Sequence, residues 1–267
     1  MNGKKTIKVA LVQMNCEKAE IDRNLGLMRD YISAGRAAGA DIVCFPEMNV
    51  TGYIDPGQYP DAVLSLEHPA IERVVSLSGE YATSVIAGFV EANPGGKPYI
   101  NQFVASDGKL LGFYRKKTIK EGEENWFAPG DGRQPVFTVS GLAFGLAICA
   151  DIDDPAIFAQ YAGMSAAAVF ECAAPGLYGE QETRNWSSGH AWWRDNCWEK
   201  LGKYAAEGAL YIGVATQAGR TKDEDFPGGG YLFGPRGERL AESGDWAEGV
   251  LYAEIPIQEG TGDPEHV

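Results

Sequence analysis

SVIAGFVEANPGGKPYINQFVASDGKLLGFYRK, residues 84–116, holds three strand-like runs in close succession. Between the second run (99–106) and the third (109–116) lies Ser-Asp-Gly-Lys, a short turn sequence typical of a β-hairpin. A hairpin makes its two strands antiparallel, whereas the strands of a plain doubly wound sheet are parallel. This stretch therefore predicts a sheet with mixed strand directions.

Strand-like and helix-like segments alternate along the rest of the chain, which is typical of an α/β protein. Strands are expected at 7–14, 41–46, 136–139, 142–148, 166–171 and 210–216, with a closing hairpin over 230–242. Helices are expected at 22–39, 69–82, 155–163 and 189–207. One doubly wound sheet would not need so many hairpins, so we expect two mixed β-sheets with helices on their outer faces.

The chain has no linker, repeat or low-complexity segment along its 267 residues. Large α/β folds of this length often form one unit. We therefore expect a single domain over 1–267, with a core from about residue 6 to residue 256 and an acidic, glycine-rich tail at 257–267.

Composition restricts the function classes. The formal net charge of −14 disfavours binding to nucleic acids and to anionic membranes, because like charges repel. No stretch approaches the roughly 20 apolar residues of a membrane span, and the N-terminal run lacks the features of a secretion signal. The five cysteines include no CxxC pair, which disfavours a disulfide framework and fits a reducing compartment. We expect a cytoplasmic protein that binds neither nucleic acid nor membrane.

Three reactive side chains directly follow apolar runs, where α/β folds often carry their site residues. Glu47 follows DIVCFP, and desolvation there would raise its pKa toward values useful to a general base. Cys149 follows LAFGLAI, and a helix starting after it would lower the thiol pKa and offer N–H groups to an oxyanion. Lys116 ends KLLGFYRK, and a buried lysine there would stabilise an oxyanion.

Each of these residues also has a simpler interpretation. Glu47 could be a solvated turn residue, and the cations at 115–117 could be a solvated charge run. Most free cysteines are inert core residues, which suits Cys16 and Cys44. Cys172 is a second candidate nucleophile, because it also follows an apolar run, AAAVFE.

Histidine is scarce, since the chain holds only His68, His190 and His266. A Cys–His or Ser–His–Asp triad would have to recruit one of them. The GxSxG, HExxH, Walker A and GxGxxG patterns do not occur in the sequence. A metal-free enzyme built on this chain would therefore use a carboxylate as its base.

Acidic residues offer a different class of site. Glu47 with Asp151, Asp153 and Asp154 could bind a hard cation and make the protein a metal-dependent hydrolase. Aspartates after a strand fit helix N-terminal caps equally well. We prefer the second interpretation, and we expect no metal site.

Three segments, in this order, resemble the signature motifs of the nitrilase superfamily of carbon–nitrogen hydrolases. They are FPEMNVTGY (45–53), FYRKKTI (113–119) with EENWFAPGD (123–131), and GLAICADIDDP (145–155). The resemblance covers nearly the whole chain. It implies a four-layer αββα sandwich of two mixed β-sheets flanked by helices, no cofactor, and a homodimer or higher homo-oligomer.

The resemblance also implies roles for particular residues. Glu47 falls on the general base, Lys116 on the oxyanion-stabilising lysine and Cys149 on the nucleophile. Glu123 matches a second glutamate that orients the lysine or takes part in proton transfer. The Ala150 N–H matches an oxyanion donor. The residues expected to line the substrate pocket are Tyr53, Trp126 and Phe127.

The sequence departs from the usual family pattern outside this catalytic set. Ala150 stands where an aromatic residue is usual, and 154–156 (Asp-Pro-Ala) stand where FPE is common. Thr118 replaces a usual histidine and Thr216 a common asparagine. These differences concern the substrate and the shape of its pocket.

The resemblance implies hydrolysis of a small-molecule amide to an acid and ammonia, through a thioester on Cys149. N-carbamoyl amines and nitriles are alternative substrates for the same catalytic set. Nitriles are less favoured, because true nitrilases tend to carry Trp-Glu after the cysteine. A non-catalytic binding module and an acyl transferase are the remaining alternatives.

Overall fold

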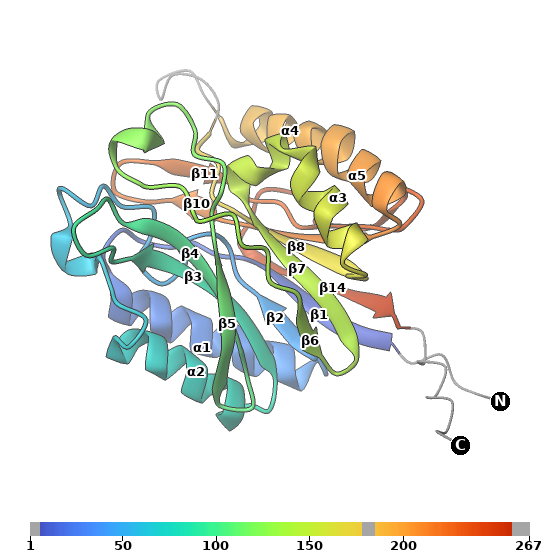
Figure 1. The fold of residues 1–267 in the computed structure, drawn as a ribbon, viewed down its shortest axis with the longest axis horizontal. Helices are drawn as coiled ribbons and strands as arrows, with labels where there is room; N and C mark the ends of the chain where they lie inside the picture. Colours follow the sequence, from blue (N-terminus) through green and yellow to red (C-terminus); the bar gives the residue numbers. More distant parts are fainter. Residues whose placement is uncertain (1–5, 178–184, 258–267) are drawn as a thin grey trace.

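Two six-stranded sheets lie face to face, and helices cover the outer face of each (Figure 1). The structure is a computed structural model, and it describes residues 6–177 and 185–257. The tail predicted at 257–267 therefore lies almost entirely outside the described residues, as does His266.

The first sheet has the strand order β14-β1-β2-β3-β4-β5. Its strands are β1 (Thr6–Gln13), β2 (Ile42–Cys44), β3 (Ser84–Glu91), β4 (Tyr99–Ser106), β5 (Lys109–Arg115) and β14 (Gly249–Pro256). The strands β1, β2 and β3 are parallel, whereas β3, β4 and β5 are antiparallel neighbours. The hairpin predicted between β4 and β5 is confirmed, and its two turn residues, Asp107 and Gly108, have positive φ angles of 52° and 71°.

The second sheet has the order β13-β12-β9-β8-β7-β6. Its strands are β6 (Phe137–Val139), β7 (Leu142–Ile148), β8 (Ala168–Ala173), β9 (Tyr211–Thr216), β12 (Tyr231–Phe233) and β13 (Arg239–Glu242). The strands β7, β8 and β9 are parallel, and the outer strands are antiparallel to their neighbours. A separate hairpin of β10 (Ala218–Arg220) and β11 (Asp225–Pro227) was not predicted, because strands of three residues are too short to show alternation.

The helices occupy the two outer layers (Figure 1). The first sheet carries α1 (Ile21–Ala37) and α2 (Pro69–Glu80), and the second carries α3 (Pro155–Gly163), α4 (Trp186–Asn196) and α5 (Gly202–Gly208). Short 3₁₀ turns are η1 (Pro60–Ala62), η2 (Glu123–Asn125) and η3 (Cys149–Asp153). Among the described residues, no helix combines the length and the apolar character needed to cross a bilayer.

The long helix predicted at 189–207 is wrong in its start and its continuity. It begins at Trp186, because the Asn185 side chain accepts a hydrogen bond from the Ser188 N–H at 2.9 Å and caps the helix. A π-helical turn, η4 (Cys197–Leu201), separates α4 from α5. A π-turn adds a residue to one turn without changing composition, so the apolar pattern did not reveal it.

Alternating side-chain directions along the strands produce three cores. Between the sheets, Leu11 and Ile86 of the first sheet belong to the same core as Phe144 and Phe170 of the second. The two aromatic rings make an edge contact with centroids 5.1 Å apart. The outer cores join each sheet to its helices, as with Val43, Ile32 and Val74 on one side and Val169, Phe158 and Leu201 on the other. The predicted four-layer αββα sandwich is therefore confirmed.

One buried polar group lies within the second outer core. Glu171 of β8 is fully buried, and neither carboxyl oxygen has a hydrogen-bond partner among the described residues. Its neighbours in alternation, Val169 and Ala173, face the helices, so Glu171 faces them too. Burial raises the pKa of Glu171 well above its usual value, and Asp151 and Glu47 add to the effect.

We predict that Glu171→Gln stabilises the protein increasingly as pH rises. Folding raises this pKa, so the folded state binds the proton more tightly than the unfolded state does. In the wild type, the stability contributed by this proton is fully present below the ordinary pKa of about 4.5. It is lost as pH rises toward the folded pKa, at up to about 1.4 kcal/mol per pH unit. Glutamine does not titrate, so the variant does not undergo this loss. Urea unfolding at pH 5 and pH 8 should show a gain that is larger at pH 8, and the exposed Glu254→Gln serves as control. A gain independent of pH would contradict the assignment.

Candidate active site

Loops that follow β2, β5 and β7 bring the predicted catalytic side chains together. Glu47 lies three residues beyond β2, Lys116 directly follows β5, and Cys149 directly follows β7. The strands β2 and β5 belong to the first sheet and β7 to the second. The site therefore depends on how the two sheets are packed together.

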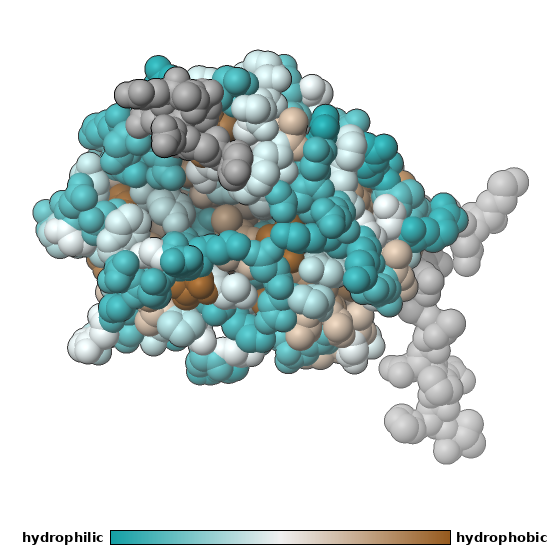
Figure 2. All heavy atoms as spheres, turned by 90° about the horizontal axis from the view of Figure 1, so that it is seen from above, coloured by the Kyte–Doolittle hydropathy of each residue, from teal (hydrophilic) through white to brown (hydrophobic). Residues whose placement is uncertain are grey.

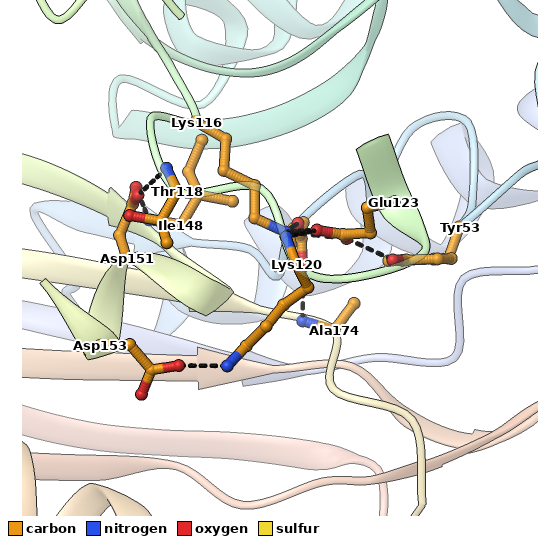
Figure 3. A network of polar contacts seen from close by, with 10 residues as sticks. Tyr53, Lys116, Thr118, Lys120, Glu123, Ile148, Asp151, Asp153 and Ala174 are labelled. Atoms are coloured by element: carbon orange, nitrogen blue, oxygen red, sulfur yellow. Dashed lines mark hydrogen bonds and ion pairs between the residues drawn. The ribbon is translucent and has the colours of Figure 1, made fainter. Parts of the chain in front are cut away.

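The Lys116 ammonium lies between two carboxylates. Its Nζ is 3.0 Å from Glu47 Oε1 and 2.9 and 3.0 Å from the two carboxylate oxygens of Glu123 (Figure 3). The main chain fixes the lysine, because its N–H donates to the Ile100 carbonyl and its carbonyl accepts from the Gly130 N–H. Burial acts to lower the pKa of Lys116, but the neighbouring carboxylates raise it above its usual value, so the ammonium stays charged.

Glu47 lies on one side of the lysine, in a fully buried position. Its carboxylate is fully buried, and Oε2 accepts a hydrogen bond from the Ala174 N–H at 3.0 Å. The Cys149 thiol is close enough to this carboxylate for each group to shift the pKa of the other. Burial raises the pKa of Glu47, Lys116 opposes this, and the charge of Glu123 adds to the increase. A raised pKa makes Glu47 a stronger base than an exposed glutamate.

Glu123 has the opposite electrostatic character. Its carboxylate accepts hydrogen bonds from the Tyr53 hydroxyl and from the Lys120 N–H, in addition to the Lys116 ammonium (Figure 3). Burial opposes ionisation, but Lys116 and the hydrogen bonds hold the pKa of Glu123 below its usual value. Two carboxyl groups on one ammonium thus have pKa values displaced in opposite directions, a pattern found where an acid–base role is divided between two groups.

Cys149 adopts a strained backbone conformation at the start of η3. Its φ angle is +47°, in the left-handed region that costs an L-residue roughly 1–2 kcal/mol. The residue as a whole is of intermediate exposure. Burial of the thiol, followed by the Glu47 charge, raises the thiol pKa well above its usual value, although Lys116 opposes them. The expected lowering of the thiol pKa by a following helix is therefore wrong, because η3 is a single short turn and burial, followed by the Glu47 charge, raises this pKa.

Ala150 occupies the second position of η3 and is buried. The first N–H groups of a helical turn have no acceptor within that turn. The Ala150 N–H therefore has no acceptor within η3, and its role as an oxyanion donor stays a prediction.

Asp151 links the loop after β5 to the end of β7. Its buried carboxylate accepts hydrogen bonds from the Tyr114 hydroxyl at 2.8 Å, the Thr118 N–H at 2.8 Å and the Ile148 N–H at 3.0 Å. These contacts fix the segments that carry Lys116 and Cys149 relative to each other. The sequence showed this aspartate only as a turn or metal-ligand candidate, because no local pattern reveals a bond to Tyr114.

The neighbouring aspartates are engaged elsewhere. Asp153 makes ion pairs with Lys120 and Lys200, and Asp154 caps α3 and lies 3.0 Å from Lys117. Among residues 6–177 and 185–257, no group of three or more acidic, histidine or cysteine side chains is arranged to hold a metal ion.

The other cations and cysteines near the site take structural positions. Arg115 binds Glu91, with Nε 2.6 Å from a carboxylate oxygen. Lys117 pairs with Asp154, so of the three consecutive cations at 115–117 it is Lys116 that enters the cluster. Cys172 is fully buried in the core between the sheets, and its sulfur lies 3.6 Å from that of Cys44. Burial raises the pKa of the Cys172 thiol well above its usual value, so Cys172 lacks the access that a nucleophile needs.

A cavity of about 460 Å³ opens next to the cluster. Tyr53, Glu123 and Trp126 line it, and Trp126 is 38% exposed. Phe127 differs from expectation, because its side chain is 1% exposed and packs in the core between the sheets. Consecutive side chains in this turn point in different directions, and their rings meet edge to face at 6.5 Å.

Fold and site together define a nitrilase-like α/β hydrolase. The chain belongs to the carbon–nitrogen hydrolase family, whose model matches residues 8–263. This confirms the predicted resemblance and the predicted enzyme class, an amidase-type carbon–nitrogen hydrolase.

Individual relatives are distant. A glutamine-dependent NAD(+) synthetase from Acinetobacter baylyi is 24% identical over 96% of this chain, which spans only 45% of that protein. An N-carbamoylputrescine amidase from Arabidopsis thaliana is 26% identical over 95% of this chain and 88% of its own length. The crystal structure of an amidase from Nesterenkonia sp. has a TM-score of 0.79 at 23% identity, over 94% of this chain and 90% of that one. The last similarity confirms the fold.

We predict that Asp151→Ala lowers the free energy of unfolding by about 3 kcal/mol or more, because it leaves two buried N–H groups and one hydroxyl without an acceptor. Tyr114→Phe removes one of these bonds and should cost only about 1 kcal/mol. Urea unfolding of both variants measures the difference. Equal, small losses would show that the carboxylate does not hold the two loops.

Proposed function

We propose that the protein hydrolyses a small amide to a carboxylic acid and ammonia, with Cys149 as nucleophile. The observation that carries this proposal is the shared Lys116 ammonium, 3.0 Å from Glu47 and 2.9 Å from Glu123. Glu47 has the raised pKa and interacts electrostatically with the thiol, whereas Glu123 has the lowered pKa. A base, a nucleophile and a fixed cation therefore lie around one point.

In the first step, Glu47 takes the thiol proton while the Cys149 sulfur attacks the amide carbon. A carbon–sulfur bond forms, and the carbonyl oxygen becomes an oxyanion. The Lys116 ammonium and the Ala150 N–H stabilise that charge, and removing one such donor typically costs about 3 kcal/mol. Glu47 then gives its proton to the leaving nitrogen, the carbon–nitrogen bond breaks, and ammonia departs from a thioester.

In the second step, Glu47 takes a proton from water, and the hydroxide attacks the thioester carbon. The carbon–sulfur bond breaks, the acid leaves, and the proton returns to the Cys149 sulfur. Glu47 thus acts as base, acid and base again, which requires a carboxyl that exchanges its proton near neutral pH. The raised pKa of Glu47 suits this cycle.

Glu123 acts in this proposal as a positioning residue. Its two carboxylate oxygens bind the Lys116 ammonium while Tyr53 and the Lys120 N–H bind the carboxylate in turn. An ionised Glu123 keeps the ammonium charged and directs it toward the site of the oxyanion. A preorganised donor of this kind needs no rearrangement during the reaction.

Relatives supply two precedents for the substrate. The Nesterenkonia amidase has been solved in complex with butyramide, and with the acetamide moiety of fluoroacetamide added covalently at its active-site cysteine. The N-carbamoylputrescine amidases of Solanum tuberosum and Arabidopsis thaliana match nearly all of this chain. Carbamoyl amines are therefore the second candidate, and they differ from simple amides in releasing a free amine and carbon dioxide together with ammonia.

We predict that Cys149→Ala abolishes turnover and that Glu47→Gln lowers kcat by about 100- to 10,000-fold, the usual contribution of a general base. Ammonia release from a panel of small amides, carbamoyl amines and nitriles measures both. The exposed Glu72→Gln is the matched control for the glutamate change.

Hydrolysis retained by Cys149→Ala would overturn the proposal. Iodoacetamide should inactivate the enzyme, because it alkylates the Cys149 thiol, and a chelator should have no effect. Inactivation by the chelator and not by iodoacetamide would indicate a metal-dependent hydrolase. When an amine is added, the rate of amide consumption should equal the rate of acid formation. Faster amide consumption would indicate an acyl transferase, because part of the acyl group would pass to the amine.

We further predict that kcat/KM falls on the acid side with an apparent pKa above the 4.5 of an ordinary glutamate. Protonation of Glu47 removes the base, and its pKa is raised by burial and by Glu123. Glu123→Gln should therefore move this acid limb to lower pH in addition to lowering kcat. A pH–rate profile of wild type and Glu123→Gln tests this, and an unchanged limb would contradict the coupling.

A further inference from the structure

The cavity beside the buried cluster has an acidic wall that the proposed chemistry does not require. Four carboxylates outside the cluster line it: Asp55, Glu121, Asp223 and Glu224. Among the described lining residues, Lys18 is the cation. Figure 2 shows that hydrophilic residues predominate on the face that it draws.

The Lys18 ammonium does not repel a cationic ligand effectively, because it forms ion pairs with two of the four wall carboxylates. Its Nζ lies 2.7 Å from Asp223 and 3.2 Å from Glu224. Partial burial acts to lower the Lys18 pKa, but these carboxylates raise it, so the ion pairs persist at neutral pH. Lys18 therefore fixes Asp223 and Glu224 in place, and four carboxylates against one ammonium leave a formal excess of three negative charges.

Two of the carboxylates face the cavity without a cation. Asp55 accepts hydrogen bonds from the Gly57 N–H and the Gln58 side chain at 2.8 and 2.9 Å, but it makes no ion pair with a described residue. Glu121 is exposed and likewise has no ion pair among the described residues. Like charges on a concave wall raise one another's energy, and a bound cation relieves this repulsion.

Aromatic faces accompany the charges. Tyr53, Tyr59 and Trp126 line the same cavity. An ammonium or guanidinium group near an aromatic face is attracted to it, most strongly to tryptophan. Carboxylates and aromatic rings together favour a cation and oppose an anion.

The cavity adjoins the cluster that contains the proposed site of reaction. Tyr53 and Glu123 line it and also bind each other, and Glu123 holds the Lys116 ammonium. A substrate whose amide reaches Cys149 would therefore leave its far end in the acidic part of the cavity.

We propose that the substrate is a cationic amide, with a protonated amine or a guanidinium group at the end remote from the scissile bond. This inference rests on the proposed amide hydrolysis and adds the substrate class to it. Asp55 and Glu121 supply the attraction, and Trp126 packs against the aliphatic part and the cation.

The test compares three amides of equal length: 5-aminopentanamide, which is cationic, hexanamide, which is neutral, and the monoamide of glutaric acid, which is anionic. Ammonia release should give a kcat/KM about tenfold or more higher for the cationic amide than for the neutral one, and lowest for the anionic one. The advantage should shrink as salt rises from 0.02 to about 0.5 M, because exposed charges are screened. Equal values for the cationic and neutral amides would overturn the inference.

The variants Asp55→Asn and Glu121→Gln localise the effect. Each should lower the ratio of kcat/KM between the cationic and the neutral amide, mainly through KM for the cationic amide. Glu72→Gln, on the outer face of α2, removes the same charge far from the cavity and should keep the ratio. A ratio that falls equally in all three variants would mean that net charge, and not this wall, sets the preference.

Failure of the inference can be told apart from failure of the proposed function. Hydrolysis of all three amides at equal rates leaves amide hydrolysis standing and removes the cationic preference. If no amide is hydrolysed, calorimetric titration of Cys149→Ala with the cationic and the neutral amide decides, because binding needs no turnover. Tighter binding of the cationic amide supports the wall as a cation site, and equal or absent binding overturns it.

Discussion

The rest of the site depends on a charged lysine held away from water by two glutamates. Removing an ammonium from water is expensive, and it is tolerated only where opposite charges and good geometry replace the solvent. Lys116 meets this condition with Glu47 on one side and Glu123 on the other. The same arrangement separates the properties of the two acids, because each has a different set of further neighbours. Burial raises the pKa of Glu47, whereas for Glu123 the Lys116 charge, together with hydrogen bonds from Tyr53 and Lys120, outweighs burial and lowers the pKa.

The packing of the two sheets provides the surroundings in which this cluster can exist. Apolar side chains fill the space between the sheets, and the loops at the ends of β2, β5 and β7 meet at the margin of that core. A water-poor environment raises the strength of each electrostatic contact. It also makes an unmatched group costly, as the unpartnered carboxyl of Glu171 illustrates. The charged groups of the cluster are thus closely paired, whereas the carboxyl of Glu171 is shifted toward its uncharged form.

Much of the fold could be read from the sequence, because it depends on local patterns. Alternation and turn residues located β3, β4 and β5 and the hairpin between the last two. Glu47, Lys116 and Cys149 could be singled out because each ends an apolar run. What the sequence did not show were contacts between distant segments, such as the Asp151 bond to Tyr114 and the Ala174 N–H bond to Glu47. The π-turn at η4 and the inward position of Phe127 were missed for the same reason, since both depend on packing and not on local composition.

The division of the site between the sheets has a consequence for how the protein tolerates change. Glu47 and Lys116 are carried by one sheet, and Cys149 and the Ala174 N–H by the other. The large side chains between the two sheets, such as Phe144 and Phe170, set the distance between the sheets. A small change in the volume of these side chains, far from any reacting atom, would misalign the Cys149 sulfur and the Glu47 carboxylate while the molecule stayed folded. The core residues must therefore be apolar and must also have the right size, and the requirement for size is the stricter of the two.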